Sequence, residues 1–207
     1  MASYPSSQLS FFGRPSLLPI SFRIALYMFL FSGTGLLLAQ QQPARLDLSV
    51  TYIGERSLKA STSQNFWMQG GSIELGANLY RGWGIAADVT GTHTGSIGTS
   101  GLQLSLVTTT FGPRYRWHAD RRLSVYGQGL IGEANGFRSI FPATAGSQSD
   151  ANGFAAQVGG GIDYRLSYRF AFRVLDAAWL RTQLPNSTDN VQNNLRLGAG
   201  VVLRFAH

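Results

Sequence analysis

The stretch that decides the fold is residues 194–205, NLRLGAGVVLRF. Its apolar positions are Leu195, Leu197, Ala199, Val201, Leu203 and Phe205. The positions between them are polar or glycine, with Val202 as the one exception. A period of two is typical of a β-strand, because successive side chains of a strand point to opposite faces. The stretch therefore predicts a strand with one apolar face and one polar face.

The same alternation recurs back to residue 45 and predicts eight strands. Their expected ranges are 45–54, 66–80, 83–92, 103–117, 122–133, 152–165, 169–182 and 191–205. The short connections are Arg81-Gly82, 118–121 and 166–168, and the long ones are 55–65, 93–102, 134–151 and 183–190. Short and long connections thus alternate along the chain. This alternation predicts an up-and-down antiparallel sheet with both termini at its short-turn end. Eight strands close readily into a barrel, which removes the unpaired sheet edges.

Two of these strands have an uncertain assignment of faces. Residues 123–133 are rich in glycine, so their inward and outward positions cannot be told apart. In 170–182 the charged residues Arg173 and Asp176 fall on opposite faces of a regular strand. A β-bulge or a wrongly assigned face would explain this.

Composition excludes several classes of protein. Of 207 residues only 13% are charged, 25 are glycine and none is cysteine. The absence of cysteine excludes a disulfide scaffold, a thiolate zinc site and a cysteine nucleophile. The net charge of +7 comes from arginines spread along the chain with the single lysine Lys59, and only Arg121-Arg122 are adjacent. This spacing argues against nucleic-acid binding. We expect no cofactor and no metal site, because no metal-ligand cluster, phosphate loop or dinucleotide motif is present.

The first 39 residues resemble a secretory signal peptide in their layout. Arg14 and Arg23 precede an apolar stretch at 24–38, which Ala39 and three glutamines follow. A cationic start, a short apolar run and a polar cleavage region are the parts of such a signal. We expect cleavage near 39–41 and a barrel domain at 45–207. An uncleaved N-terminal anchor is the alternative.

The apolar face of a closed barrel points inward in a soluble lipocalin-like protein and outward in a membrane barrel. The polar faces here are rich in glycine and carry few charges, which fits a narrow lumen better than a soluble surface. The expected lumen charges are Glu74, Asp88, Asp163, Arg114, Arg173 and Arg196. We expect Glu74 and Asp88 to face Arg173 or Arg196 across the interior. Such pairs would form a structural plug or a gated trickle pore.

Aromatic residues gather at the strand ends, as the two interfaces of a bilayer require. Those beside the short turns are Tyr80, Trp83, Tyr115, Trp117, Tyr164, Tyr168, Phe170 and Phe205. Those toward the long loops are Phe66, Trp67, Phe154 and Trp179. Tyr80 has the parity of a lumen residue in this register. The ordinary enrichment of aromatic residues in β-sheets would account for any one of them.

Several segments resemble strands of stand-alone OmpA-type outer-membrane β-barrel proteins. They are FGPRY at 111–115, RRL at 121–123, GGGIDYR at 159–165, FRV at 172–174, NNLRLGAGV at 193–201 and RF at 204–205. The resemblance implies a monomeric eight-stranded transmembrane barrel in the cell outer membrane, with both termini in the periplasm. It implies contact with membrane lipids and lipopolysaccharide. It also implies that the barrel-assembly machinery reads a closing-strand signal at Leu203 and Phe205, which here precedes Ala206 and His207.

The expected function is a structural or surface-interaction role without catalysis. One alternative is a soluble periplasmic ligand-binding barrel. The other is a lipid-acting barrel enzyme, for which His93 with Ser96 nearby would be the only plausible base and nucleophile. The long loop 134–151 is where recognition would occur. Its Phe137, Arg138, Ile140 and Phe141 would be adhesive or would fold over the barrel mouth.

Overall fold

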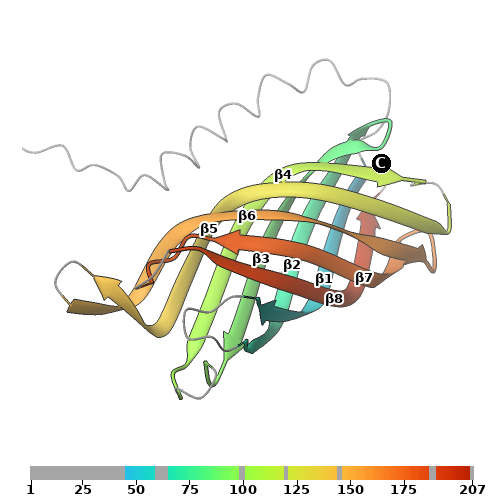
Figure 1. The fold of residues 1–207 in the computed structure, drawn as a ribbon. Helices are drawn as coiled ribbons and strands as arrows, with labels where there is room; N and C mark the ends of the chain where they lie inside the picture. The colour runs from blue at the N-terminus through green and yellow to red at the C-terminus, as the bar shows by residue number, and fades with distance from the viewer. Residues whose placement is uncertain are drawn as a thin grey trace, which may run out of the picture. The chain divides into compact units, whose positions relative to one another are not determined.

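The computed structural model describes residues 45–58, 65–97, 101–118, 121–143, 146–186 and 190–205. Residues 42–207 form one compact unit, and the expected signal peptide at 1–39 lies outside the described residues. The unit holds eight strands: β1 Arg45–Ser57, β2 Trp67–Tyr80, β3 Trp83–Thr94, β4 Leu104–Trp117, β5 Leu123–Ala143, β6 Gly146–Arg165, β7 Phe170–Thr182 and β8 Gln192–Phe205. Each strand pairs with the next, and β8 pairs with β1, so the sheet closes into an antiparallel barrel (Figure 1).

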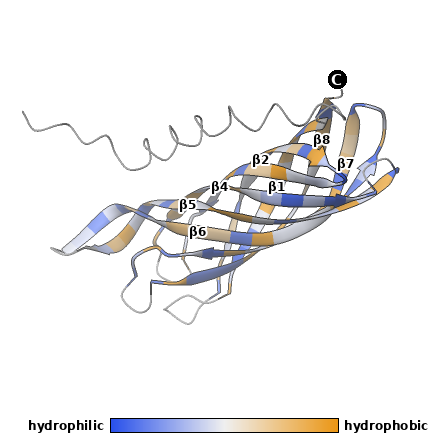
Figure 2. Cartoon of the chain, turned by 90° about the horizontal axis from the view of Figure 1, so that it is seen from above, coloured by the Kyte–Doolittle hydropathy of each residue, from blue (hydrophilic) through white to orange (hydrophobic). Residues whose placement is uncertain are grey.

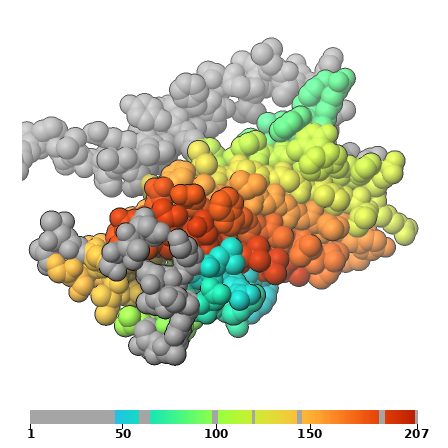
Figure 3. All heavy atoms as spheres, in the orientation of Figure 1, coloured from blue at the N-terminus to red at the C-terminus, as the bar shows by residue number. Residues whose placement is uncertain are grey.

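The predicted up-and-down topology is confirmed by the closure between the first and last strands. Leu46 pairs with Phe205, so the start of β1 and the end of β8 lie side by side at one end of the barrel. In Figure 3 the red atoms of the last strand lie next to the cyan atoms of the first. The two-residue turn Arg81-Gly82 lies between β2 and β3, and both residues have positive φ, 46° and 88°. That conformation suits the right-handed twist of a β-hairpin.

Apolar side chains cover the outside of the barrel and charged ones lie within. On β3, Val89 is 49% exposed whereas its neighbour Asp88 is 3% exposed. Figure 2 shows hydrophobic and hydrophilic positions mixed along each strand, as this alternation requires. The lipocalin-like alternative, with an apolar interior, is therefore wrong.

A β-bulge in β7 explains the two charges of opposite parity. Arg173 pairs with Gly200 and Asp176 pairs with Gly198, so Val174 and Leu175 together oppose Ala199. Val174 and Leu175 are both exposed on the outer face. The alternation of inward and outward positions therefore shifts by one residue between Val174 and Leu175. As a result, Arg173 and Asp176 both point inward.

The loop expected at 134–151 is wrong. These residues extend β5 and β6 into a hairpin, whose ladder continues to Ala143 and Gly146. The last pair between β4 and β5 is Ser105 with Phe137, so the hairpin projects beyond its neighbours (Figure 1). Residues that favour turns predict a loop here, but antiparallel pairing depends on the backbone and tolerates such residues. In the same way β1 continues to Ser57 and β3 to Thr94, into expected loops.

A three-residue irregularity bends this hairpin. Phe137 pairs with Asp150 and Phe141 with Gln148, so residues 138–140 oppose Ser149 alone. Arg138 has a φ of 57°. The bend brings Phe141 back over Gly136, where a Cβ atom would lie 2.6 Å from the Phe141 ring. We expected the apolar residues of this segment either to be adhesive or to fold over the barrel mouth. Phe141 folds over the mouth, whereas Phe137 and Ile140 are exposed.

An apolar cluster fills the interior at the end of the long connections. We call it the apolar plug: Met68, Leu106, Ala134, Phe141, Ala151, Ala155, Leu180 and Leu184, with Phe66 and Leu104 packed against it. The part of the chain described here contains no helix of sufficient length and hydrophobicity to span a membrane.

Candidate functional site

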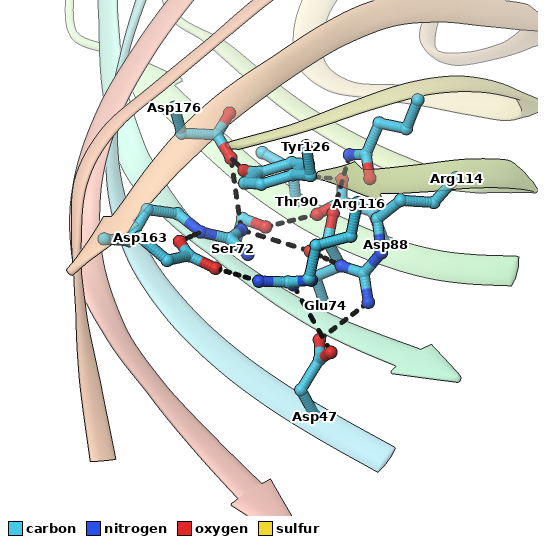
Figure 4. Close-up of polar contacts among 12 residues, drawn as sticks. Asp47, Ser72, Glu74, Asp88, Thr90, Arg114, Arg116, Tyr126, Asp163 and Asp176 are labelled. Atoms are coloured by element: carbon cyan, nitrogen blue, oxygen red, sulfur yellow. Dashed lines mark hydrogen bonds and ion pairs between the residues drawn. The ribbon is translucent and has the colours of Figure 1, made fainter. Parts of the chain in front are cut away.

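The six charged residues expected in the lumen all lie in the barrel interior, and none is more than 3% exposed. They come from β2, β3, β4, β6, β7 and β8, and Figure 4 shows how most of them point toward one another. We call them, with the further charged and hydrogen-bonding partners described below, the interior ion-pair network. Inward positions recur every second residue, so six strands can each deliver a charge to one space.

Arg114 bridges two carboxylates on different strands. Its Nη2 donates to Asp47 Oδ1 at 2.7 Å and its Nη1 donates to Glu74 Oε1 at 2.9 Å. To reach them the side chain passes from β4 across β3 to β2 and β1. Gly76 on β2 faces inward and supplies the space for the guanidinium.

Arg173 joins three carboxylates. Its Nε donates to Asp163 at 3.1 Å, and its Nη1 donates to Glu74 at 3.1 Å and to Asp176 at 3.2 Å. Its guanidinium also lies 4.5 Å from the ring centroid of Tyr126, a cation–π distance. The Tyr126 hydroxyl donates to Asp176 in turn.

Arg196 forms a second centre of the network, around Asp88. It donates to Asp88 Oδ1 at 3.4 Å and also to Gln157 and Thr90. Glu74 and Asp88 are direct cross-strand partners, a juxtaposition that like charges disfavour. The structure pairs Glu74 with Arg173 and Asp88 with Arg196, so each carboxylate has its own cation.

Sequence reasoning missed several members of the network: Asp47, Glu55, Arg116, Tyr126, Gln128 and Asp176. Asp47 and Arg116 lie on the polar faces of their strands, so the alternation could have found them. Arg116 donates to Asp163 at 2.6 Å and to Asp47 at 3.3 Å. Tyr126 and Gln128 lie in the glycine-rich strand, where no alternation of hydrophobicity marks the inward face.

The network pairs most of its buried charges. In the described interior, five of the six buried carboxylates form ion pairs with the buried guanidiniums of Arg114, Arg116, Arg173 and Arg196, and the sixth, Glu55, has neutral partners. Arg204 lies 3.9 Å from Asp163 at the edge of the network. Glu55 accepts hydrogen bonds from Asn194 at 2.6 Å and from Thr92 at 3.4 Å. Buried charges persist only when they are paired and hydrogen-bonded, so the network ties the walls of the barrel together.

The interior thus has two layers, the ion-pair network and the apolar plug. The plug lies at the end of the long connections, since Met68 and Leu106 begin β2 and β4 while Leu180 is near the end of β7. The paired arginine and carboxylate side chains of the network occupy the lumen next to the plug. This arrangement can stiffen the barrel and obstruct the passage of ions. Within the described residues, no group of His, Cys, Asp or Glu is placed to hold a metal ion.

The aromatic residues beside the short turns lie on the outer face. Tyr80, Trp83, Trp117, Tyr164, Tyr168, Phe170 and Phe205 are exposed, and Tyr115 is half-buried. Trp83, Tyr115 and Trp117 pack edge to face, with ring centroids 5.0 and 4.5 Å apart. The lumen parity assigned to Tyr80 is wrong, because a register shift between Asn78 and Tyr80 turns it outward. At the closing strand Leu203 pairs with Leu48 and Phe170, and Ala206 and His207 lie outside the described residues.

The structure places His93 beside a different serine from the one that the sequence suggested. Its Nδ1 lies 3.0 Å from Ser105 Oγ on the neighbouring strand, on the outer surface. Ser96 instead accepts a hydrogen bond from Thr94 through its backbone oxygen. Among the described side chains, His93 contacts no carboxylate that would orient its ring as in a catalytic triad.

The fold is similar to that of solved bacterial surface proteins. The Neisserial surface protein A, NspA, matches with a TM-score of 0.59 and 16% identity over 77% of this chain and 97% of that one. Ail, the attachment invasion locus protein of Yersinia pestis, matches with a TM-score of 0.54 and 21% identity over 79% of this chain and 99% of that one. Ail has also been solved with the heparin analogue sucrose octasulfate. No curated protein matches the sequence.

The family comparison covers the whole barrel. The family described as outer membrane protein beta-barrel domain matches residues 25–205, which include all eight strands. With its apolar exterior, charged interior and closed eight-stranded sheet, the chain belongs to the outer membrane protein beta-barrel domain family.

Proposed function

We propose that this protein is a sealed, monomeric barrel of the outer membrane with a structural or surface-interaction role and no catalytic activity. The observation that carries the proposal is the contrast between Val89, exposed on the outer wall, and Asp88, buried next to it within the network. A wall of this kind is stable when lipid covers the outside. The filled interior gives no support to a role in transport.

The proposed orientation follows from the connections. Residues 1–39 act as the signal peptide, with cleavage near 39–41, and the barrel-assembly machinery inserts the chain by reading Leu203 and Phe205. Both termini and the short turns lie in the periplasm. The long connections and the β5–β6 hairpin then face outward, where they meet lipopolysaccharide and other cells.

The hairpin supports the surface-interaction part of the proposal. It extends past β4 and β7 and exposes Phe137, Arg138 and Ile140. Projecting segments on a rigid scaffold commonly carry recognition. Ail, the attachment invasion locus protein, has a similar fold.

Cell fractionation with gel mobility tests the location. We expect the protein in the outer-membrane fraction, with a folded band that migrates differently from the boiled band. Recovery in the soluble periplasm would overturn the proposal. The sealed lumen is tested separately in planar bilayers, where we expect no steady conductance from the wild-type protein. If Glu74→Ala and Arg173→Ala leave both conductance and melting temperature unchanged, the network neither seals nor stiffens the barrel.

A lipid-acting enzyme is the second candidate, and only the His93–Ser105 hydrogen bond favours it. A serine next to an imidazole can serve as an activated nucleophile. Mass spectrometry of lipid A from cells with the wild-type protein and with His93→Ala decides between the two. We expect identical lipid A. A missing acyl chain that returns in the variant would establish the enzyme.

A further inference from the structure

We infer that the short-turn end of the barrel carries a binding site for an acidic peptide segment. The site consists of four arginines on adjacent strands, which we call the mouth arginines: Arg122 just before β5, Arg165 at the end of β6, Arg169 just before β7 and Arg204 near the end of β8. The inference rests on the proposed function for its location only, because the proposed orientation places this end in the periplasm. The partner is then an acidic segment of a periplasmic protein.

The mouth arginines form two cross-strand pairs. The backbone nitrogen of Arg165 donates to the backbone oxygen of Arg122 at 2.7 Å, and that of Arg204 donates to the backbone oxygen of Arg169 at 2.8 Å. Each of these bonds continues the ladder between its two strands by one residue. Like charges directly opposite each other destabilise a sheet. An anion bound between the two arginines of a pair would remove that repulsion.

The mouth arginines lie on the inward faces of their strands. Two residues further into the barrel on the same strands, the side chains are buried and point inward: Ser124, Asp163, Ala171 and Val202. Positions two residues apart on a strand share a face. The Nη2 atom of Arg204 donates to Ser124 Oγ at 3.2 Å, so this side chain reaches from β8 toward β5. The site therefore surrounds the end of the lumen and does not face the acyl chains of the membrane.

Positive charge predominates at this end of the barrel. Two of the mouth arginines are exposed and the other two are half-buried. Among the described residues, the exposed carboxylates are Glu133 and Asp150, and both lie toward the long connections. The carboxylate of Asp163, 3.9 Å from Arg204, is already shared by Arg116 and Arg173. Cations concentrated at a narrow opening attract an anionic ligand.

The spacing of the two pairs suits a peptide with several carboxylates. Neighbouring strands are about 4.8 Å apart, so the centres of the two pairs lie about 10 Å apart. An extended peptide advances about 3.3 Å per residue, so acidic side chains two or three residues apart match this separation. Guanidinium groups bind carboxylates through two parallel hydrogen bonds. A single small anion would reach only one of the pairs.

The test measures peptide binding to the barrel in phosphatidylcholine nanodiscs, whose lipid has no net charge. The probes are rhodamine-labelled hexaglutamate and hexaglutamine, followed by fluorescence anisotropy at low ionic strength. We expect the wild-type protein to bind hexaglutamate at least about tenfold more tightly, as one charge-assisted contact implies. Inorganic phosphate should displace hexaglutamate far less effectively than the unlabelled peptide does. Equal binding of the two peptides, or equal displacement by phosphate, would overturn the inference, and neither comparison depends on the folding of a variant.

Two variants locate the site. Arg169→Gln should weaken the binding of hexaglutamate about tenfold, because one pair loses a cation. Arg81→Gln is the matched control: Arg81 is also exposed at the short-turn end, but it lies over the Tyr80 ring, 5.0 Å from the ring centroid, in the turn between β2 and β3. We expect it to bind hexaglutamate as the wild type does. Equal effects of the two variants would overturn the inference and leave the membrane location intact, whereas failure of the wild-type protein to enter nanodiscs would count against the proposed function.

Discussion

Arg114 occupies the space that Gly76 leaves empty. A Cβ atom on Gly76 would lie 1.4 Å from Arg114 Nη2 and 2.6 Å from Asp47 Oδ1. The guanidinium cannot retreat without breaking its contacts with Asp47 and Glu74, at 2.7 and 2.9 Å. The glycine on β2 thus determines where the charge on β4 is held.

Gly76→Ala should lower the free energy of unfolding by about 1–3 kcal/mol, the usual cost of overpacking. Urea unfolding in lipid vesicles, followed by tryptophan fluorescence, measures this. Gly91→Ala is the matched control, because its new methyl group points outward into open space. Equal stability of the two variants would show that Arg114 moves freely.

Arg173→Met should destabilise the barrel by about 3–5 kcal/mol, because three carboxylates lose a common partner in a buried space. Arg181→Met, on the outer face of the same strand, should cost less than about 1 kcal/mol. The same unfolding assay compares them. A small loss at Arg173 would mean that water enters the interior and solvates the carboxylates.

The contact between Glu74 and Arg173 should appear as a coupling energy. Glu74→Gln and Arg173→Met, alone and together, form a double-mutant cycle. We expect the double variant to be more stable than the sum of the single losses predicts, by about 0.5–3 kcal/mol. Strict additivity would show that the 3.1 Å contact contributes nothing.

Phe141→Ala should loosen the β5–β6 hairpin and leave the barrel intact. Phe141 is 7% exposed against the apolar plug, whereas its neighbour Ile140 is 61% exposed. We expect faster hydrogen exchange across residues 138–150 in Phe141→Ala and no change in Ile140→Ala. Unchanged exchange in both variants would mean that the backbone ladder alone holds the hairpin.

The inward positions could be predicted wherever hydrophobicity alternates regularly. Glu74 and Asp88 follow directly from the parity of β2 and β3, as do the outward Ile73 and Val89. Asp176 could not be placed, because the bulge at Val174 and Leu175 reverses the parity after Arg173. A bulge adds one residue to one strand only. In a single sequence it is visible only as charged residues that fall on opposite faces of a regular strand.

Tyr126 and the hairpin escaped prediction for different physical reasons. Tyr126 sits in a strand where glycine makes both faces look alike, and its ring fits because Gly161 opposite has no side chain. The hairpin at 134–151 contains residues that favour turns, and its strands form through backbone pairing that composition does not encode. In both cases the conformation depends on residues of the neighbouring strand β6.

The most direct test of the account is the environment of adjacent residues on β3. The chain has no cysteine, so single spin labels at Val89→Cys and Thr90→Cys can be read in lipid vesicles without background. We predict that the label at 89 is relaxed by dissolved oxygen and shielded from a water-soluble nickel complex, while the label at 90 is shielded from both. A label at 89 that the nickel complex reaches as easily as a label at Ile140→Cys would contradict the lipid-facing wall.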